Sequence, residues 1–228
     1  MLTTAFVLVL AYAPVDADQG VIQKIFYVHV PLAITALCGF VAGGIMAIQY
    51  LRTRDRRWDL RSYVTIHLSI VLAVGVLITG SIWARASWGH WWVWDEPMLV
   101  VFLIVFLLYA TYQPLRFSIE DPEKQARYAS VFAIVAGAFV PLCFGAVRMA
   151  EAATQTHPQT GTMTTSGPGS VTLTFLVALT GMTLLFVTLC KYEMASKNVT
   201  SQLRRLRRRL QDADDPLGAP GRSAAPQL

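Results

Sequence analysis

The chain has 228 residues, of which 54% are hydrophobic and only 14% are charged, with a formal net charge of +5 at pH 7. A soluble domain carries about 25% charged residues, so this composition excludes an ordinary water-soluble globule. Long uncharged intervals separate the charged positions, and each can hold the roughly 20 apolar residues that cross a bilayer as a helix. The sequence therefore predicts an all-α integral membrane protein.

Six transmembrane helices are expected, and the first is the least regular. The predicted spans are 1–13, 29–50, 63–83, 97–113, 128–147 and 170–190. The first stretch is short for a crossing. A signal peptide has a similar apolar core, but no basic flank precedes this stretch and Pro14 would directly follow the cut. We therefore expect a membrane domain over 1–190 that is a bundle of six helices with a shortened first one. Gly39, Gly43 and Gly44 in the second span are predicted to allow close approach of a neighbouring helix.

The positive charges predict the orientation of the bundle. All 19 lysine and arginine residues except Lys24, Arg85 and Arg148 lie in 51–61, in 114–127 or after residue 190. Basic residues are retained on the cytoplasmic side of a membrane, so these segments and the C-terminus are expected there. The alternate connections, including the one at 84–96, would face outward.

Residues 191–228 are predicted to form a basic cytoplasmic tail that is partly disordered. Its arginines cluster within Leu203–Leu210, and Asp, Pro, Gly and Ala dominate the end. This composition predicts a short surface helix followed by disorder, beside anionic membrane lipid. Membrane topology accounts for the positive charge, so no nucleic-acid partner is expected.

Several common catalytic and binding motifs do not occur in the sequence. There is no C-x-x-C pair for redox chemistry or covalent haem attachment, no G-x-x-x-x-G-K-[ST] loop and no Rossmann fingerprint. The chain is therefore not expected to bind a nucleotide through either common loop.

Tryptophan is concentrated in the outward connection. Five of the six tryptophans fall between Trp83 and Trp94, whereas the span ends near residues 50, 113 and 190 carry none. Tryptophan is enriched at membrane interfaces, so an aromatic belt is one interpretation. Flat indole faces can also pack against a flat apolar ligand, so a ligand platform is the other.

The histidines extend the second interpretation. His29 lies at the outer edge of a span and His157 in another outward segment, so the topology places them on either side of the tryptophan loop. Haem iron commonly takes an axial imidazole, and two such ligands could hold a haem whose edge meets the indoles. His67, inside a span, is more typical of a satisfied polar group, and a hydrogen bond to another helix or a proton path are the other roles open to it. His90 has no assigned role.

Residues 88–95 read Trp-Gly-His-Trp-Trp-Val-Trp-Asp and resemble the W-G-x-x-W-W-x-W-D signature of bacterial haem-handling membrane proteins, with one residue fewer after the glycine. With Tyr27-Val28-His29-Val30-Pro31, the loop order and the length, the chain is similar to the haem exporter protein C family, also called cytochrome c maturation protein C. The resemblance implies that His29 and His157 are axial ligands of haem iron. It also implies that the tryptophan-rich segment completes the haem site through Trp88, Gly89, Trp91, Trp92, Trp94 and Asp95.

The resemblance implies a delivery protein of system I cytochrome c maturation rather than an enzyme. It would hold haem b as a transient, non-covalent cargo at the periplasmic face of the bacterial plasma (inner) membrane. The cargo would pass to a membrane-anchored haem chaperone. The other implied partners are the ATP-binding and permease subunits of an ABC transporter complex, a small single-span subunit and membrane lipid.

The chain departs from the family pattern after Asp95. The family motif continues to an arginine, whereas this chain reads Glu-Pro-Met-Leu at 96–99. An arginine there could pair with a haem propionate, and Arg85 or Arg148 are the outward residues that could replace it. For Asp95 two roles stay open, as a polar group that orients an indole N–H or a chaperone group, or as the cap of the helix near Pro97.

Three other functions remain open from the residues alone. One is a component of a system II-type cytochrome c synthase, although those chains have further spans. Another is a membrane transporter subunit that binds a different apolar ligand, such as quinone or lipid. The third is an assembly factor whose indoles contact a protein partner and never haem.

Overall fold

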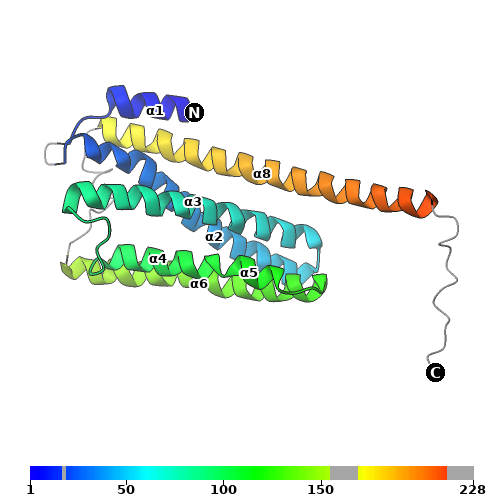
Figure 1. The fold of residues 1–228 in the computed structure, drawn as a ribbon. Helices are drawn as coiled ribbons and strands as arrows, with labels where there is room; N and C mark the ends of the chain where they lie inside the picture. The colour runs from blue at the N-terminus through cyan, green and yellow to red at the C-terminus, as the bar shows by residue number, and fades with distance from the viewer. Residues whose placement is uncertain (17–18, 155–168, 215–228) are drawn as a thin grey trace. The chain divides into compact units, whose positions relative to one another are not determined.

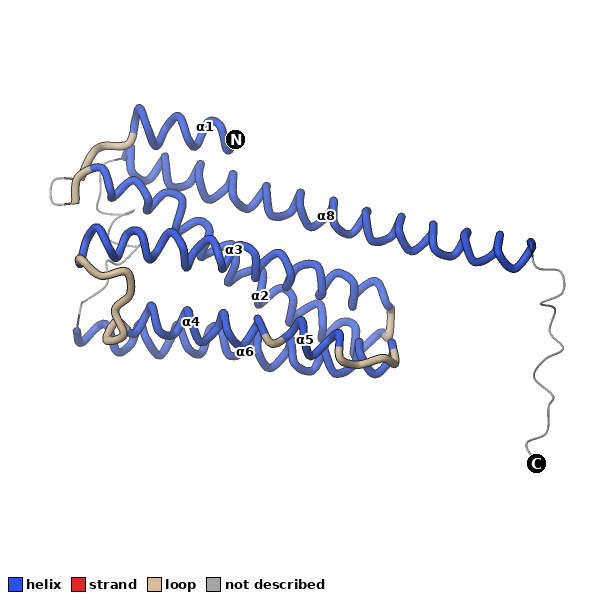
Figure 2. The backbone as a smooth tube through the Cα atoms, in the orientation of Figure 1, coloured by secondary structure: helices blue, strands red, loops and turns tan. Residues whose placement is uncertain are grey.

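The computed structural model describes residues 1–16, 19–154 and 169–214, and these are helical apart from short connections (Figures 1 and 2). The helices in chain order are α1 (Leu2–Val7) with a π-helical continuation (Leu8–Tyr12), a 3₁₀ segment (Val21–Ile25), α2 (Phe26–Thr53), α3 (Arg56–Trp88), α4 (Pro97–Ala110), α5 (Tyr112–Phe117), α6 (Pro122–Thr154) and α8 (Gly169–Asp214). Within the described ranges the only β-type pairing is an isolated bridge between Asp16 and Gly20. The predicted all-α class is confirmed.

Five described helical stretches are long and apolar enough to cross a membrane. They are Val21–Thr53, Arg56–Trp88, Pro97–Phe117, Pro122–Met149 and Gly169–Gln211. A shorter apolar helix, Leu2–Tyr12, precedes them. The expected integral membrane protein, with a short first helix before five full spans, is confirmed.

The connection that was predicted to face outward is shorter than expected. Helix α3 continues to Trp88, so the connection to α4 covers only 89–96 and two tryptophans of the cluster belong to the helix. Gly89 ends α3 with φ of +78°, and its amide donates to the Arg85 carbonyl at 3.1 Å. A residue without a side chain adopts this left-handed conformation at no steric cost.

The surface helix predicted within the tail is part of a longer helix. Helix α8 continues without interruption from Gly169 to Asp214. Residues 182–214 contain no glycine or proline, and they are rich in Leu and Arg, which favour helix. A drop in hydropathy marks the end of the apolar stretch, whereas a helix ends only where backbone conformation or propensity ends it.

Residues 1–190 form one compact unit, and residues 191–228 form another. In the first unit, α2 packs against both α3 and α6. A Cβ added at Gly39 would lie 2.1 Å from Ser69 Oγ, and one at Gly43 would lie 2.5 Å from Ile66 Cγ1 on α3. At Gly44 it would lie 2.9 Å from the Ala133 carbonyl oxygen on α6. The predicted close-packing role of the α2 glycines is confirmed.

Replacing Gly44 by alanine is expected to destabilise the bundle by about 1–3 kcal/mol, because the added methyl group meets backbone that cannot step aside. Thermal unfolding in detergent measures the effect. Gly145→Ala on α6 is the matched control, since a Cβ there meets nothing within 4 Å. That control should be neutral or stabilise by up to about 1 kcal/mol. Equal melting temperatures for the two variants would contradict the close contact of α2 with α6.

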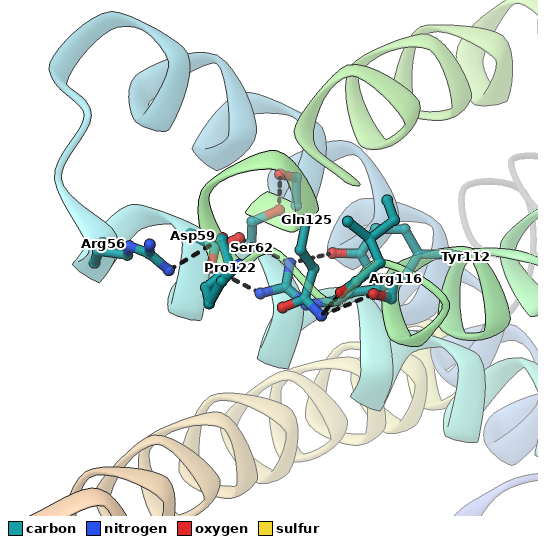
Figure 3. A network of polar contacts seen from close by, with 9 residues as sticks. Arg56, Asp59, Ser62, Tyr112, Arg116, Pro122 and Gln125 are labelled. Carbon is teal, nitrogen blue, oxygen red and sulfur yellow. Dashed lines mark hydrogen bonds and ion pairs between the residues drawn. The ribbon is translucent and has the colours of Figure 1, made fainter. Parts of the chain in front are cut away.

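A buried ion pair connects α3 to α5 (Figure 3). Arg116 Nη1 and Nη2 donate to the two carboxylate oxygens of Asp59, each at 2.7 Å. Nη1 also lies 3.4 Å from Tyr112 Oη, and the guanidinium lies 4.8 Å from the centre of the Tyr63 ring. Asp59 is in the first turn of α3 and Arg116 in the last turn of α5, where each helix dipole favours that charge.

The two predicted cytoplasmic connections of the bundle meet beside this pair. Arg56 Nη1 donates to the Pro122 carbonyl oxygen at 3.2 Å, and Gln125 Nε2 donates to the Arg116 carbonyl oxygen at 2.8 Å (Figure 3). Asp121 precedes α6 and caps its first turn, since its Oδ1 accepts from the amides of Glu123 and Lys124 at 2.8 and 3.0 Å. These backbone hydrogen bonds hold the pKa of Asp121 below its usual range.

Candidate functional site

A cavity of about 180 Å³ lies within the first unit, between α2, α3, α4 and α6. The start of α2, the end of α3, the start of α4 and the end of α6 lie at one end of the bundle (Figure 1). The lining is largely apolar, and it also includes His29, Trp92 and Arg148. The arrangement therefore offers an apolar compartment with one imidazole, one indole N–H and one cation.

His29 reaches the cavity from the first turns of α2. Its Nδ1 lies 2.9 Å from Thr79 Oγ1 on α3. The backbone of Gly80 leaves room for the imidazole, since a Cβ there would lie 3.0 Å from His29 Cε1. The ring is half-buried, so it is held by α3 on one side and is accessible to a ligand on another.

The tryptophans divide between the cavity and the surface. Trp83, from α3, and Trp92, from the connection, both line the cavity. Trp88 packs edge-on against Trp83 with ring centres 4.8 Å apart, and Trp94 packs against Trp92 at 5.9 Å. Trp91 and Trp94 are 60% and 71% exposed. Two indoles thus form part of the cavity wall, while others extend the aromatic surface around it.

Trp92 carries a buried polar atom that needs an acceptor. Its Nε1 is inaccessible to solvent and has no hydrogen-bond partner among the residues that the structure describes. Leaving a buried donor unsatisfied costs about 1–3 kcal/mol. Trp83 differs, because its Nε1 donates to Gln19 Oε1 at 3.2 Å. Trp92 thus lines the cavity and carries a buried indole donor without an acceptor among the described residues.

The structure brings together only part of the predicted site. His29 and Trp92 line the cavity, and His157 lies outside the described residues. The remaining members of the predicted set do not line it, namely Trp88, Gly89, Trp91, Trp94 and Asp95. Their expected role in binding stays a prediction. Trp94 is joined to the cavity wall through its contact with Trp92.

The capping interpretation of Asp95 is wrong. Glu96, not Asp95, occupies the position before α4, and no side-chain hydrogen bond caps this helix. Pro97 begins the helix, where its missing N–H has no intrahelical acceptor to lose. Asp95 is exposed beside the tryptophans.

Some residues of the cavity were not in the predicted set. Trp83 lines the cavity but was not among the predicted site residues. It belongs to the tryptophan cluster and lies at the last residue of a predicted span. Arg148 lines the cavity, whereas Arg85 donates to the Gly89 carbonyl oxygen at the end of α3. Of the two candidates to replace the motif arginine, Arg148 is the one that the fold places in the cavity wall.

The two other histidines lie apart from the cavity. His67 Nδ1 lies 3.3 Å from Gln113 Nε2, and its ring packs near Tyr63. The interpretation of His67 as a satisfied polar group agrees with this hydrogen bond to α5. His90 is exposed in the connection between α3 and α4.

Comparison with known proteins agrees with this architecture. The model of the Heme exporter protein C family matches residues 1–210. The Heme exporter protein C of Rhodobacter capsulatus is 35% identical over 131 residues, which cover 58% of this chain and 54% of that protein. The Paracoccus denitrificans protein of the same name is 34% identical over 129 residues, 57% of this chain and 53% of that protein. The match to these two relatives spans about half their length.

A longer match comes from the Heme exporter protein C of Bradyrhizobium diazoefficiens. It is 31% identical over 203 residues, which cover 86% of this chain and 74% of that protein. Residues 1–210, which the family model matches, contain both His29 and the tryptophan-rich connection. With five apolar spans, a short first helix and a cavity beside the tryptophans, the chain belongs to the Heme exporter protein C family.

Proposed function

We propose that this protein binds haem at the tryptophan-lined end of its bundle and delivers it to a haem chaperone during cytochrome c maturation by system I. The observation that carries the proposal is the cavity, which combines His29 with an apolar wall, two indoles and a cation. Haem combines the same features in one molecule: an apolar ring system, an iron that takes imidazole ligands and two carboxylates. Haem b is then a non-covalent cargo, with His29 and His157 as the axial ligands.

The dimensions of the cavity suit a cargo that must leave again. Pockets that enclose a drug-sized ligand measure about 300–1,000 Å³, so a cavity of about 180 Å³ accepts only part of the macrocycle. The cavity lining includes Phe102 and Phe144, and the exposed indoles of Trp91 and Trp94 lie outside that lining, where they could cover the rest of the macrocycle. A haem held in this way keeps an edge accessible for a chaperone.

Two groups of the cavity wall suit the haem propionates. Trp92 Nε1 is a buried donor, and a carboxylate oxygen is a strong acceptor for it. Arg148 supplies a positive charge from α6. In this proposal these two residues take the place of the arginine that follows the tryptophan motif elsewhere in the family.

The charges support an orientation with this cavity outside the cytoplasm. The basic connections at 51–61 and 114–127 meet through the Arg56–Pro122 hydrogen bond. Lysine and arginine are retained on the cytoplasmic side, and this supports a tryptophan connection on the periplasmic face of the bacterial plasma membrane. The chaperone would dock there. The ATP-binding and permease subunits of an ABC complex and a small single-span subunit are the other proposed partners.

Absorption spectroscopy of the detergent-purified protein tests the proposal. The wild type should bind haem with a low-spin, six-coordinate spectrum, and His29→Ala or His157→Ala should convert it to a high-spin spectrum or lose it. Loss of an iron ligand should weaken haem binding by about 100-fold or more, since even the loss of a residue behind a ligand costs 10–100-fold. His90→Ala changes a histidine that is exposed in the connection between α3 and α4 and absent from the cavity lining, so this control should match the wild type.

Two outcomes would overturn this function. A wild type that neither carries haem nor binds it when supplied would exclude a haem carrier. An assembly factor that contacts protein through its indoles would then be the better interpretation. Haem binding that survives both histidine substitutions unchanged would keep the cargo but overturn its ligands.

A further inference from the structure

We propose that Thr79 and Gly80 on α3 are positioning residues that select the tautomer of His29, so that Nε2 is the nitrogen that binds iron. The inference rests on the proposed haem function, because it concerns how one proposed ligand is prepared for the metal. It is carried by the hydrogen bonds of a single hydroxyl group and by the space over a single glycine.

The Thr79 hydroxyl has one hydrogen and three close polar neighbours. Its Oγ1 lies 2.8 Å from the Gly75 carbonyl oxygen and 3.2 Å from the Val76 carbonyl oxygen, both on α3. It also lies 2.9 Å from His29 Nδ1. A carbonyl oxygen can only accept, so the hydroxyl hydrogen is used within α3, as is usual for threonine in membrane helices. Oγ1 then faces the imidazole with a lone pair.

A lone pair on Oγ1 requires a hydrogen on Nδ1 of His29. A neutral imidazole carries a single N–H, so a hydrogen at Nδ1 leaves the lone pair at Nε2. Metal-binding histidines generally donate their second ring nitrogen to a neighbouring acceptor, which fixes both tautomer and ring orientation. Thr79 provides that acceptor from a rigid helix, 50 residues away in the sequence.

Gly80 provides the space for the ring in this orientation. A Cβ at position 80 would lie 3.0 Å from His29 Cε1, 3.7 Å from Nδ1 and 3.8 Å from Nε2. Cε1 is the carbon between the two nitrogens, so a side chain here would push the imidazole away from both Thr79 and its place in the cavity wall. Two consecutive residues of α3 thus position the His29 ring: Thr79 supplies the hydrogen-bond acceptor, and Gly80 leaves the space that the ring occupies.

The decisive variant is Thr79→Val, which keeps the shape of the side chain and removes the acceptor. Haem titration of the purified full-length protein should show an affinity about 10-fold lower than that of the wild type. Loss of the hydrogen-bond partner of a metal ligand usually lowers affinity by about 10- to 100-fold. The low-spin ferric EPR spectrum should also shift, because the Nδ1–H bond alters electron donation from the imidazole. Thr79→Ser keeps the hydroxyl and should restore both the affinity and the spectrum.

Thr180→Val is the matched control. Thr180 also bonds back to its own helix, with Oγ1 2.7 Å from the Leu176 carbonyl oxygen, but it is exposed and lies outside the cavity lining. A purely structural role of threonine back-bonding would give equal effects at positions 79 and 180. Gly80→Ala provides a second test and should weaken haem binding, while Gly145→Ala, with open space around its Cβ, should not.

The possible failures are distinguishable. Wild-type protein that binds no haem would overturn the proposed function itself. Wild type that binds haem, with Thr79→Val equal to it in both affinity and EPR spectrum, would overturn the positioning role alone. If Thr79→Val does not fold, the comparison passes to Thr79→Ser and Gly80→Ala. An unchanged affinity in Gly80→Ala would then overturn the inference.

Discussion

Replacing Asp59 by asparagine is expected to lower the free energy of unfolding of the bundle by about 3–5 kcal/mol, because it leaves the guanidinium of Arg116 buried without its counter-charge. The two side chains are only 9% and 10% exposed, and they share two hydrogen bonds of 2.7 Å. Tyr112 and Tyr63 offer a hydroxyl and a ring face, which cannot neutralise the charge. Thermal or denaturant unfolding in detergent measures the loss.

The double variant Asp59→Leu/Arg116→Met separates the ion pair from the cost of an isolated charge. Apolar replacement of both partners is often neutral, so the double variant should be more stable than Asp59→Asn. The less buried pair between Lys197 and Glu193, whose side chains are 36% and 20% exposed and lie 3.4 Å apart within one helix, gives the matched control. Glu193→Gln should cost no more than about 0.5 kcal/mol. Equal effects at Asp59 and Glu193 would contradict burial of the Asp59–Arg116 pair.

This ion pair also shows where sequence reasoning reaches its limit. Arg116 reads as one more positive charge in a cytoplasmic connection, and that reading correctly identifies the helix end at which it lies. Its partner is 57 residues away, and nothing in hydropathy or charge pattern selects Asp59 from the other acidic residues. Hydropathy predicts spans because burial in lipid depends on local composition, whereas a pairwise contact depends on how helices pack.

The same distinction applies to the candidate site. The tryptophan motif and the His-Val-Pro segment identify the end of the bundle at which the cavity lies, because both are local patterns. Which indoles line the cavity depends on where α3 ends, and α3 continues to Trp88. Trp83 therefore faces the cavity from a helix while Trp92 returns to it from the connection. Thr79 and Gly80 carry no local signal at all, since their relation to His29 exists only after α2 and α3 pack.

Filling the cavity is expected to weaken haem binding without unfolding the protein. Ala33 lines the cavity one helical turn beyond His29 on α2, so the ring of an Ala33→Phe variant would occupy the space that the proposal assigns to the macrocycle. Overpacking costs about 1–3 kcal/mol, and the same energy directed against the ligand corresponds to about 5- to 150-fold weaker binding. Haem titration followed by absorbance measures the change.

The control for this substitution is Ile45→Phe on the same helix. Ile45 is 56% exposed on the surface of the bundle and lies outside the cavity lining, so the larger ring there should leave haem affinity unchanged. The melting temperature of both variants, measured without haem, tells steric exclusion from unfolding. If Ala33→Phe folded with the stability of Ile45→Phe and still bound haem with wild-type affinity, the macrocycle would have to bind elsewhere on the aromatic surface. Because this experiment leaves both proposed iron ligands in place, it tests the position of the cargo independently of its coordination.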